Sequence, residues 1–266
     1  MTLLPQARIV ERTGYRSPLA VSCRDGSTGA EVTDGLVASA WLRSDPRTRY
    51  TATRSPLSGV LGFGNLPRMW RASHATAGPG EPLTWPAVAP TAMCVLVQDL
   101  QERYLPVTLA VDVPVGAPVT VPLSSAPTRP PSSGFATVRG EVHSAGTGPP
   151  LGWALVRIDT GGDVYQTIAD ARGRFVLQVP WPEALPPLTP SGPGLSTVTW
   201  PLTVSVRSEP GALVLSPGTT SNDPPELSSV SGQGAAQLVD GGNHPSIVAT
   251  LAFGRPLVLA LTAVPA

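Results

Sequence analysis

Apolar and polar side chains alternate over short runs of this chain, and the clearest run lies at residues 167–180. Phe175 and Leu177 alternate there with Arg174 and Gln178, which is the period of a strand that buries one face. An Asp-Ala-Arg-Gly sequence at residues 170–173 precedes this strand. Asp and Gly suit tight turns, so the segment predicts two antiparallel strands joined by a turn.

Similar runs recur along both halves of the chain. In the first half we expect strands at residues 18–24, 35–42, 50–53, 60–66, 93–97 and 107–113. In the second half we expect them at residues 137–143, 153–158, 165–169, 174–179, 202–207 and 257–263. Short strands separated by turns predict an all-β chain with two antiparallel β-sandwich domains of transthyretin or immunoglobulin type.

A stretch rich in Pro and Ser separates the two halves. It lacks apolar periodicity, and its prolines favour an extended, semi-rigid spacer. We therefore predict an N-terminal arm at residues 1–15, a first sandwich at 16–123, a linker at 124–134 and a second sandwich at 135–266. The second domain has a Gly/Ser/Pro-rich insertion at about 208–246, which we expect to be mobile or to order on a neighbour.

The halves also share a local pattern. Residues 58–67 and residues 172–180 each place Gly before a strand that holds one Phe and ends in an apolar residue followed by Pro. Duplication of a sandwich unit explains this pattern, and so do two turns that obey the same chemistry.

Composition narrows the classes of protein. The 32 prolines and 27 glycines among 266 residues exclude long helices. A hydrophobic fraction of 41% with only 14% charged residues is atypical of a disordered chain. The 18 basic residues, all of them Arg, balance 18 acidic residues, so nucleic-acid binding is not expected.

No motif of known chemistry stands in the sequence. His74, His143 and His244 are isolated, and the spacing of a zinc site is absent. Ser231 is not preceded by the Gly that begins a Gly-x-Ser-x-Gly nucleophile elbow. Residues 62–64 (Gly-Phe-Gly) lack the third Gly and the following helix of a dinucleotide-binding motif. We predict no catalytic residue, no cofactor and no metal.

Three aspartates lie close together in the second half. Asp159, Asp163 and Asp170 each stand beside Gly or at a strand end, where Asp forms turns. Calcium binding by this region is the weaker alternative.

The cysteines and the N-terminus bear on the compartment. Cys23 and Cys94 have apolar neighbours, which predicts two buried free thiols, with one disulfide between them as the alternative. Charges near the N-terminus interrupt the apolar run of a signal peptide. No apolar segment approaches the roughly 18 residues of a membrane helix. We expect a protein of the bacterial cytoplasm without membrane insertion.

The sequence contains six tryptophans, and any that are exposed could bind a ligand. Trp41 and Trp153 lie in strand patterns and are expected in cores. Trp181 and Trp200 stand beside prolines and are expected to pack over a sandwich end, whereas Trp70 and Trp85 lie in an irregular stretch and are expected to be exposed. Exposed aromatics stack on sugars, so carbohydrate binding is an alternative to packing or a protein interface.

Part of the second half resembles a known family. Residues 138–142 (Val-Arg-Gly-Glu-Val), 154–158 (Ala-Leu-Val-Arg-Ile) and 170–175 (Asp-Ala-Arg-Gly-Arg-Phe) are similar to the carboxypeptidase regulatory-like family. The resemblance implies a transthyretin-like β-sandwich without catalytic residues of its own.

The first half resembles proteins encoded with bacterial contractile injection systems, which are phage-tail-like particles. Residues 25–42, 50–67 and 97–107 carry the resemblance. The family's Asp-x-x-x-Arg-aromatic-Leu-Pro pattern is held by Asp99, Arg103, Tyr104, Leu105 and Pro106. Leu61 stands where the family has an aromatic residue, and Arg68, Met69 and Trp70 replace a Gly-Leu-Arg-like run. The resemblance implies a structural baseplate component without chemistry.

The leading hypothesis is therefore a non-enzymatic bracket between other subunits of a contractile particle, present in several copies in a symmetric assembly. Expected partners are baseplate proteins, with tube or sheath proteins as further candidates. The candidate interface residues are Trp70, Trp85, Arg103, Tyr104, Trp181 and Trp200. A carbohydrate- or surface-binding module is the second hypothesis, and an enzyme accessory domain or an unrecognised hydrolase is the third.

Overall fold

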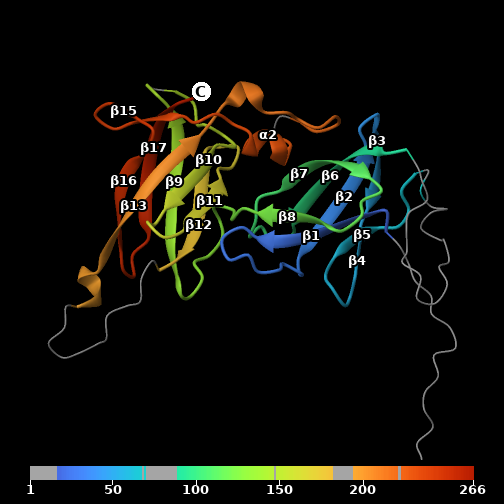
Figure 1. The fold of residues 1–266 in the computed structure, drawn as a ribbon, viewed down its shortest axis with the longest axis horizontal. Helices are drawn as coiled ribbons and strands as arrows, with labels where there is room; N and C mark the ends of the chain where they lie inside the picture. The colour runs from blue at the N-terminus through green and yellow to red at the C-terminus, as the bar shows by residue number, and fades with distance from the viewer. Residues whose placement is uncertain (1–16, 68, 70–88, 147, 182–193, 221–222) are drawn as a thin grey trace, which may run out of the picture.

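Two β-sandwiches lie side by side in the computed structural model (Figure 1). The structure describes residues 17–67, 69, 89–146, 148–181, 194–220 and 223–266. The predicted all-β sandwich architecture is confirmed, since the described elements are almost all strands. The predicted N-terminal arm lies outside the described residues.

The first sandwich is built from two four-stranded sheets, in the orders β4-β5-β1-β8 and β3-β2-β6-β7. Its strands are β1 (Leu19–Asp25), β2 (Leu36–Leu42), β3 (Asp45–Thr51), β4 (Thr53–Arg54), β5 (Leu61–Phe63), β6 (Thr91–Asp99), β7 (Val107–Val113) and β8 (Val119–Leu123). The strand β8 was not predicted. It contains Pro122, and proline is accepted in a strand only where no backbone donor is needed, as on an edge.

The second sandwich has sheets in the orders β12-β9-β17-β14-β15 and β11-β10-β13-β16. Its strands are β9 (Phe135–Ser144), β10 (Leu155–Asp159), β11 (Val164–Ile168), β12 (Arg174–Pro180), β13 (Thr199–Arg207), β14 (Gln237–Val239), β15 (Asn243–His244), β16 (Ile247–Ala252) and β17 (Leu257–Val264). Short helical turns are η1 (Leu195–Thr197), η2 (Pro210–Ala212) and α2 (Leu227–Ser231). No helix among the described residues is long and apolar enough to cross a membrane.

The two sandwiches share one connectivity. In the first, β5-β1-β8 faces β3-β2-β6-β7; in the second, β12-β9-β17 faces β11-β10-β13-β16. Each sandwich also contains one parallel pair, β1 with β8 and β9 with β17, where we expected wholly antiparallel sheets. The repeated sequence pattern falls on β5 and β12, which occupy the same place in the two orders. This agreement is what duplication of a sandwich unit would produce.

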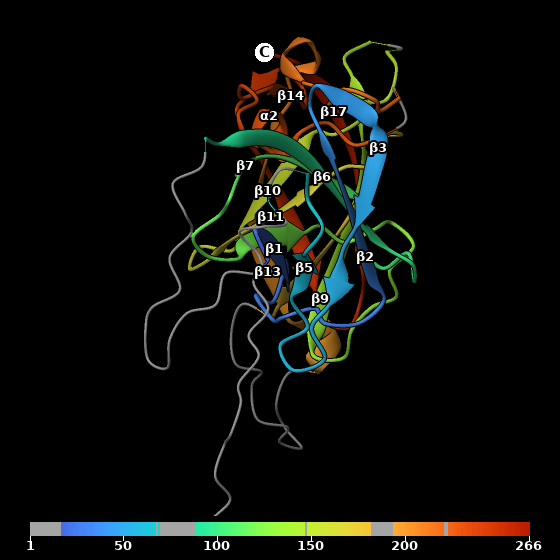
Figure 2. The same cartoon turned by 90° about the vertical axis from the view of Figure 1, so that its right-hand side faces the viewer.

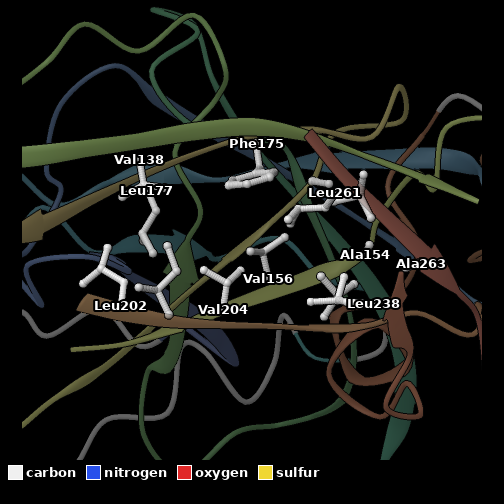
Figure 3. Close-up of a cluster of buried hydrophobic side chains, with 14 of the residues drawn as sticks. Val138, Ala154, Val156, Phe175, Leu177, Leu202, Val204, Leu238, Leu261 and Ala263 are labelled. Carbon is white, nitrogen blue, oxygen red and sulfur yellow. The ribbon is translucent and has the colours of Figure 1, made fainter. Parts of the chain in front are cut away.

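Each sandwich has its own core of inward-facing aliphatic side chains. Figure 3 shows Phe175 and Leu177 of β12 packed toward Val156 and Val204 of the opposite sheet. Phe175 pairs with Gly140 across the strands. A Cβ at Gly140 would lie 2.2 Å from the carbonyl oxygen of Leu259. The parallel strand β17 therefore approaches β9 closely because position 140 has no side chain.

The predicted insertion is not a free loop in its described parts. We call residues 208–220 and 223–233 the strap. The strap leaves the second sandwich after β13 and lies against the first sandwich, as the orange segment in Figure 1 shows. It returns to its start, where Ser208 N–H donates to the carbonyl of Gly234 at 3.0 Å. The expectation that this segment is mobile or orders on a neighbour is thus corrected: it is docked within its own chain.

Candidate functional site

The junction between the sandwiches is where three distant parts of the chain meet. These parts are the β6–β7 turn with the residues after it, the linker that follows β8, and the strap. Figure 1 shows α2 next to β7 where the two sandwiches meet, and in Figure 2 the first sandwich faces the viewer with the second behind it. The family-like pattern at residues 99–106 stands at this junction.

An Asp–Arg pair fixes the β6–β7 turn. Asp99, whose side chain is fully buried, accepts hydrogen bonds from Arg103 N at 2.9 Å and from Arg103 Nε at 2.9 Å. Arg103 also bonds the Asp34 carbonyl at 2.8 Å and pairs with its carboxylate at 3.2 Å. A Cβ at Gly35 would lie 2.9 Å from an Asp99 carboxylate oxygen. The turn thus ties β2 and β6 together at one end of their sheet.

The charge state of Asp99 follows from these contacts. Burial opposes its ionisation, but the hydrogen bonds from Arg103 and from the backbone of Gln101 outweigh that cost and lower the pKa of Asp99. The hydrogen bonds and charges of Asp99 and Asp34 raise the pKa of Arg103. The pair is therefore a fixed internal ion pair, which suits a structural role.

Tyr104 joins the turn to the linker. Its hydroxyl donates to Asp25 Oδ2 at 2.8 Å, and Arg129 of the linker pairs with the same oxygen at 2.6 Å. The Arg129 guanidinium also lies 4.7 Å from the centre of the Tyr104 ring. Burial and the bond to Asp25 raise the pKa of Tyr104 to about 12. Burial opposes ionisation of Asp25, but the bonds from Arg129 and Tyr104 lower its pKa.

The linker is hydrogen-bonded at both ends. Leu105 N–H donates to Ser124 O, and Ala126 N–H donates to Arg103 O, each at 2.9 Å. At its other end, the buried Gln178 of β12 donates from Nε2 to Pro130 O at 2.8 Å. Proline stiffens the backbone between these anchors. The linker therefore joins the first sandwich to the second through fixed contacts.

The strap covers part of the outer face of the sheet β3-β2-β6-β7. Trp41, Cys94 and Thr108 have no exposed surface, yet none belongs to the core cluster of the first sandwich. Trp41 pairs with Cys94 across β2 and β6, on the face opposite Ala40. The strap supplies their burial: Trp41 Nε1 donates to Pro217 O at 2.8 Å.

Arg49 and Gly218 complete the contact of the strap with this face. The Arg49 guanidinium lies 3.5 Å from the Trp41 ring centre and donates to Gly218 O at 3.0 Å. Gly218 has a φ of +79°, and a Cβ there would lie 2.3 Å from Pro46 Cβ. Only glycine fits this position without displacing the strap.

A buried carboxylate anchors the second part of the strap. Glu226 accepts from Ser216 Oγ at 2.9 Å and pairs with Arg43 of the first sandwich at 3.0 Å. Residue 226 also forms a parallel bridge with Thr108 of β7. Gln233 then bonds Trp153 O of the second sandwich at 2.9 Å. The strap is thus bound to both sandwiches.

Apolar side chains fill the space between these polar anchors. Leu105 and Val107 meet Trp153 of the second sandwich and Leu227 and Val230 of the strap around a cavity of about 10 Å³. Such a space holds one water molecule at most. A second hollow, of about 380 Å³, lies on the outer face of β12, β9 and β17 between Arg139, Glu141 and Val258.

The predicted interface residues have different places in the structure. Trp70 and Trp85 lie outside the described residues. Arg103 and Tyr104 make the internal contacts given above. Trp200 is buried, and the half-buried Trp181 packs against it with ring centres 5.5 Å apart. A partner contact through any of the six stays a prediction.

The sequence-based interpretation missed the strap and the position of Trp41 under it. Trp41 and Pro217 are 176 positions apart, so no local pattern connects them. Gly and Pro in the strap indicated an irregular segment, and they gave no signal of what it contacts. Cys23 and Cys94 are both free and buried, Cys23 in the core of the first sandwich and Cys94 under the strap.

The acidic residues considered for calcium make turn contacts. Asp170 accepts from the backbone of Arg172 and Arg174 at 2.9 Å each and pairs with the Arg174 side chain at 2.7 Å. Asp159 accepts from Gly161 N. In the described part of the chain, no three His, Cys, Asp or Glu residues come together as a metal site would require.

No family model and no curated protein matches this chain. Among solved structures it is similar to the Bacillus anthracis TIE protein, with 12% identity and a TM-score of 0.26 over 94% of this chain and 34% of that one. The chain thus spans about a third of that protein. It is also similar to the shaft pilin SpaA from Lactobacillus rhamnosus GG, with 9% identity and a TM-score of 0.24 over 93% and 97% of the two chains. For the group B streptococcus pilus 2b backbone protein, the identity is 8% and the TM-score 0.25 over 97% and 90%. Likenesses this weak carry no argument about function.

Proposed function

We propose that this chain is a non-enzymatic structural component of a bacterial contractile injection system, and that it acts in the baseplate as a bracket between other subunits. It would be made in the bacterial cytoplasm and incorporated there, in several copies, into the particle. Its partners would be other baseplate proteins, with tube or sheath proteins beside them.

The observation that carries this proposal is the strap. A bracket must hold two binding surfaces at a fixed separation, and a flexible linker alone does not do so. Here the strap binds the first sandwich through Trp41 and Arg43 and the second through Trp153. The linker adds fixed contacts on both sides.

The ionisable residues of the junction support a structural role. Asp25 and Asp99 each have an Arg partner and hydrogen bonds that favour the ionised form, and Glu226 pairs with Arg43. Catalytic acids and bases are instead tuned to exchange protons near neutral pH. The family-like residues 99–106 take part in these contacts, which ties the resemblance to the geometry of the junction.

An affinity-tagged copy of the chain, expressed in the native host, tests the proposal. We expect sheathed, tail-like particles in the eluate by electron microscopy, with sheath and tube proteins identified by mass spectrometry. The control is an equally tagged, unrelated β-sandwich protein. Recovery of the chain alone, from cells in which such particles are present, would reject the proposal.

Carbohydrate binding has less support from the described aromatic residues. Trp41 and Trp200 are buried, and Trp181 packs between Trp200 and Phe253. Binding through Trp70 or Trp85 stays a prediction. Retention on a glycan array that is lost in Trp70→Ala or Trp85→Ala would favour this second function.

A further inference from the structure

β16 is the outermost strand of its sheet and lacks the usual protection of an edge strand. The sheet order β11-β10-β13-β16 ends at this strand in the described part of the chain. Its sequence, Ile-Val-Ala-Thr-Leu-Ala, has no charged residue and no proline, and Val248 is 73% exposed. Proteins normally protect such edges with charges, prolines, short strands or covering segments.

The other described edge strands have such protection. β3 carries Asp45, Pro46 and two arginines, and β8 carries Pro122. β4 and β15 are two residues long. β12 has Gln178 bonded to the linker, and β11 has Thr167 bonded to Val176 of β12. β7, the equivalent of β16 in the first sandwich, is bridged at Thr108 by Glu226 of the strap.

The backbone groups that face the open edge follow from one hydrogen bond. Phe253 N–H, next to the end of β16, donates to Val198 O beside the start of β13. Backbone N–H and C=O groups point to alternate sides along an antiparallel strand. Those of Ala249 and Leu251 therefore also point toward β13. Val248, Thr250 and Ala252 direct their backbone N–H and C=O groups to the open edge, where the Ala252 carbonyl also accepts a bond from Arg255 N–H at 3.3 Å.

We propose that a second copy of this chain binds at the open edge of β16, with the two β16 strands antiparallel about a two-fold axis beside Thr250. Thr250 then faces Thr250 of the second copy, and Val248 faces Ala252 of that copy. This register pairs the three edge-facing residues of one strand with those of the other. It also keeps inward-facing side chains on the same side, so two four-stranded sheets become one continuous sheet.

Charge favours a second copy as the occupant. Two neutral β16 strands meet without like-charge repulsion, whereas two β3 strands would bring their arginines together. The outward side chains at the contact, Val248, Thr250 and Ala252, are small enough to pair directly.

This inference depends on the sheet edge and not on membership of a particle, so the purified full-length chain tests it. Sedimentation velocity at micromolar concentration is expected to show a dimer. Thr250→Lys places two like charges directly opposite each other at the two-fold axis and should weaken the dimer by about 100-fold or more. Val258→Lys is the matched control, because Val258 is an exposed valine on β17 in the other sheet, and it should leave the dimer intact.

A cysteine at the axis tests the register. Hydrogen-bonded antiparallel pairs have Cα atoms about 5.5 Å apart, within the range of a disulfide. With oxidised glutathione as the oxidant, which takes up the two electrons of the paired thiols, Thr250→Cys should give a covalent dimer. Val258→Cys should not, and the native Cys23 and Cys94 are buried.

Three results would overturn the proposal. The first is that the purified parent chain is monomeric, even if its β16 edge binds a strand of another protein. The second is a dimer that Thr250→Lys leaves unchanged while Val258→Lys disrupts it. The third is equal cross-linking of Thr250→Cys and Val258→Cys. Circular dichroism and thermal melts of each variant separate a lost interface from a lost fold.

Discussion

At the scale of single residues, Gly140 sets the distance between β9 and β17. The Leu259 carbonyl oxygen and the Phe175 ring occupy the space that a Cβ would need, at 2.2 and 3.0 Å. Gly140→Ala should therefore lower the free energy of unfolding by about 1–3 kcal/mol, the usual cost of overpacking. Urea denaturation measures the change.

Gly162→Ala is the matched control, because nothing lies within 4 Å of a Cβ at that position. It should change the free energy of unfolding by less than about 0.5 kcal/mol. Equal stability of Gly140→Ala and the parent chain would show that β17 does not approach β9 as described.

Two buried carboxylates predict the response to acid. Asp25 and Asp99 both have a pKa below the ordinary value because their hydrogen-bond partners outweigh the cost of burial. Their stabilisation is therefore present above the unfolded-state pKa of about 4 and is lost as the pH falls through the lower folded-state pKa. We expect the free energy of unfolding of the parent to fall steeply with acid in this window.

Asp99→Asn tests the origin of this acid response. The variant should be less stable than the parent by about 1–3 kcal/mol at neutral pH, because it weakens hydrogen bonds to a charged group. The difference should shrink as the pH falls below about 4. Asp112→Asn, at an exposed position of β7, serves as control. If Asp99→Asn and the parent differ in free energy of unfolding by the same amount from neutral to acid pH, ionised Asp99 is not the origin of the acid response.

At the scale of elements, the strap protects Cys94. Burial raises the pKa of this thiol, so it should react slowly with thiol reagents. Gly218→Ala introduces a Cβ 2.3 Å from Pro46 Cβ at a φ of +79° and should displace the strap. The labelling rate at Cys94, located by peptide mass spectrometry, should then rise at least about tenfold.

The control for this prediction lies within the strap itself. Gly211 has nothing within 4 Å of a Cβ and no positive φ, so Gly211→Ala should keep the parent rate. If Gly218→Ala also labels at the parent rate, the strap does not cover Cys94 in solution.

Alternation along the sequence predicted most strands because each strand buries one face locally. The predicted strand at residues 107–113 coincides with β7, and the turn at 170–173 is closed by Asp170 as expected. The strap was beyond such reasoning, because it has no local apolar period and its partners Trp41 and Arg43 lie in the other half. Trp41 was expected in a core, and it is buried on the opposite face of its strand.

The junction was predictable only in part. The family-like pattern indicated Arg103 and Tyr104 as interface candidates, and both contribute to the junction. The partners of Tyr104, which are Asp25 and Arg129, come from the end of β1 and from the linker. Contacts between segments so far apart depend on how the strands are arranged, which single-sequence patterns do not give.

At the scale of the whole molecule, the strap and the linker give two parallel connections between the sandwiches. The strap contributes Trp41–Pro217, Arg43–Glu226 and Gln233–Trp153, and the cavity between these contacts is about 10 Å³. Two packed connections leave little freedom for one sandwich to rotate against the other. A bracket that positions two neighbours needs this rigidity.

The most direct test of this rigidity is a distance measurement by pulsed electron paramagnetic resonance. Leu57→Cys in the first sandwich and Val258→Cys in the second place spin labels at exposed positions, while Cys23 and Cys94 are buried. Dilution with unlabelled protein removes distances between copies. We expect one narrow distance distribution, because the strap and the linker hold the two sandwiches in one arrangement. A broad distribution, as for two domains on a flexible linker, would contradict it.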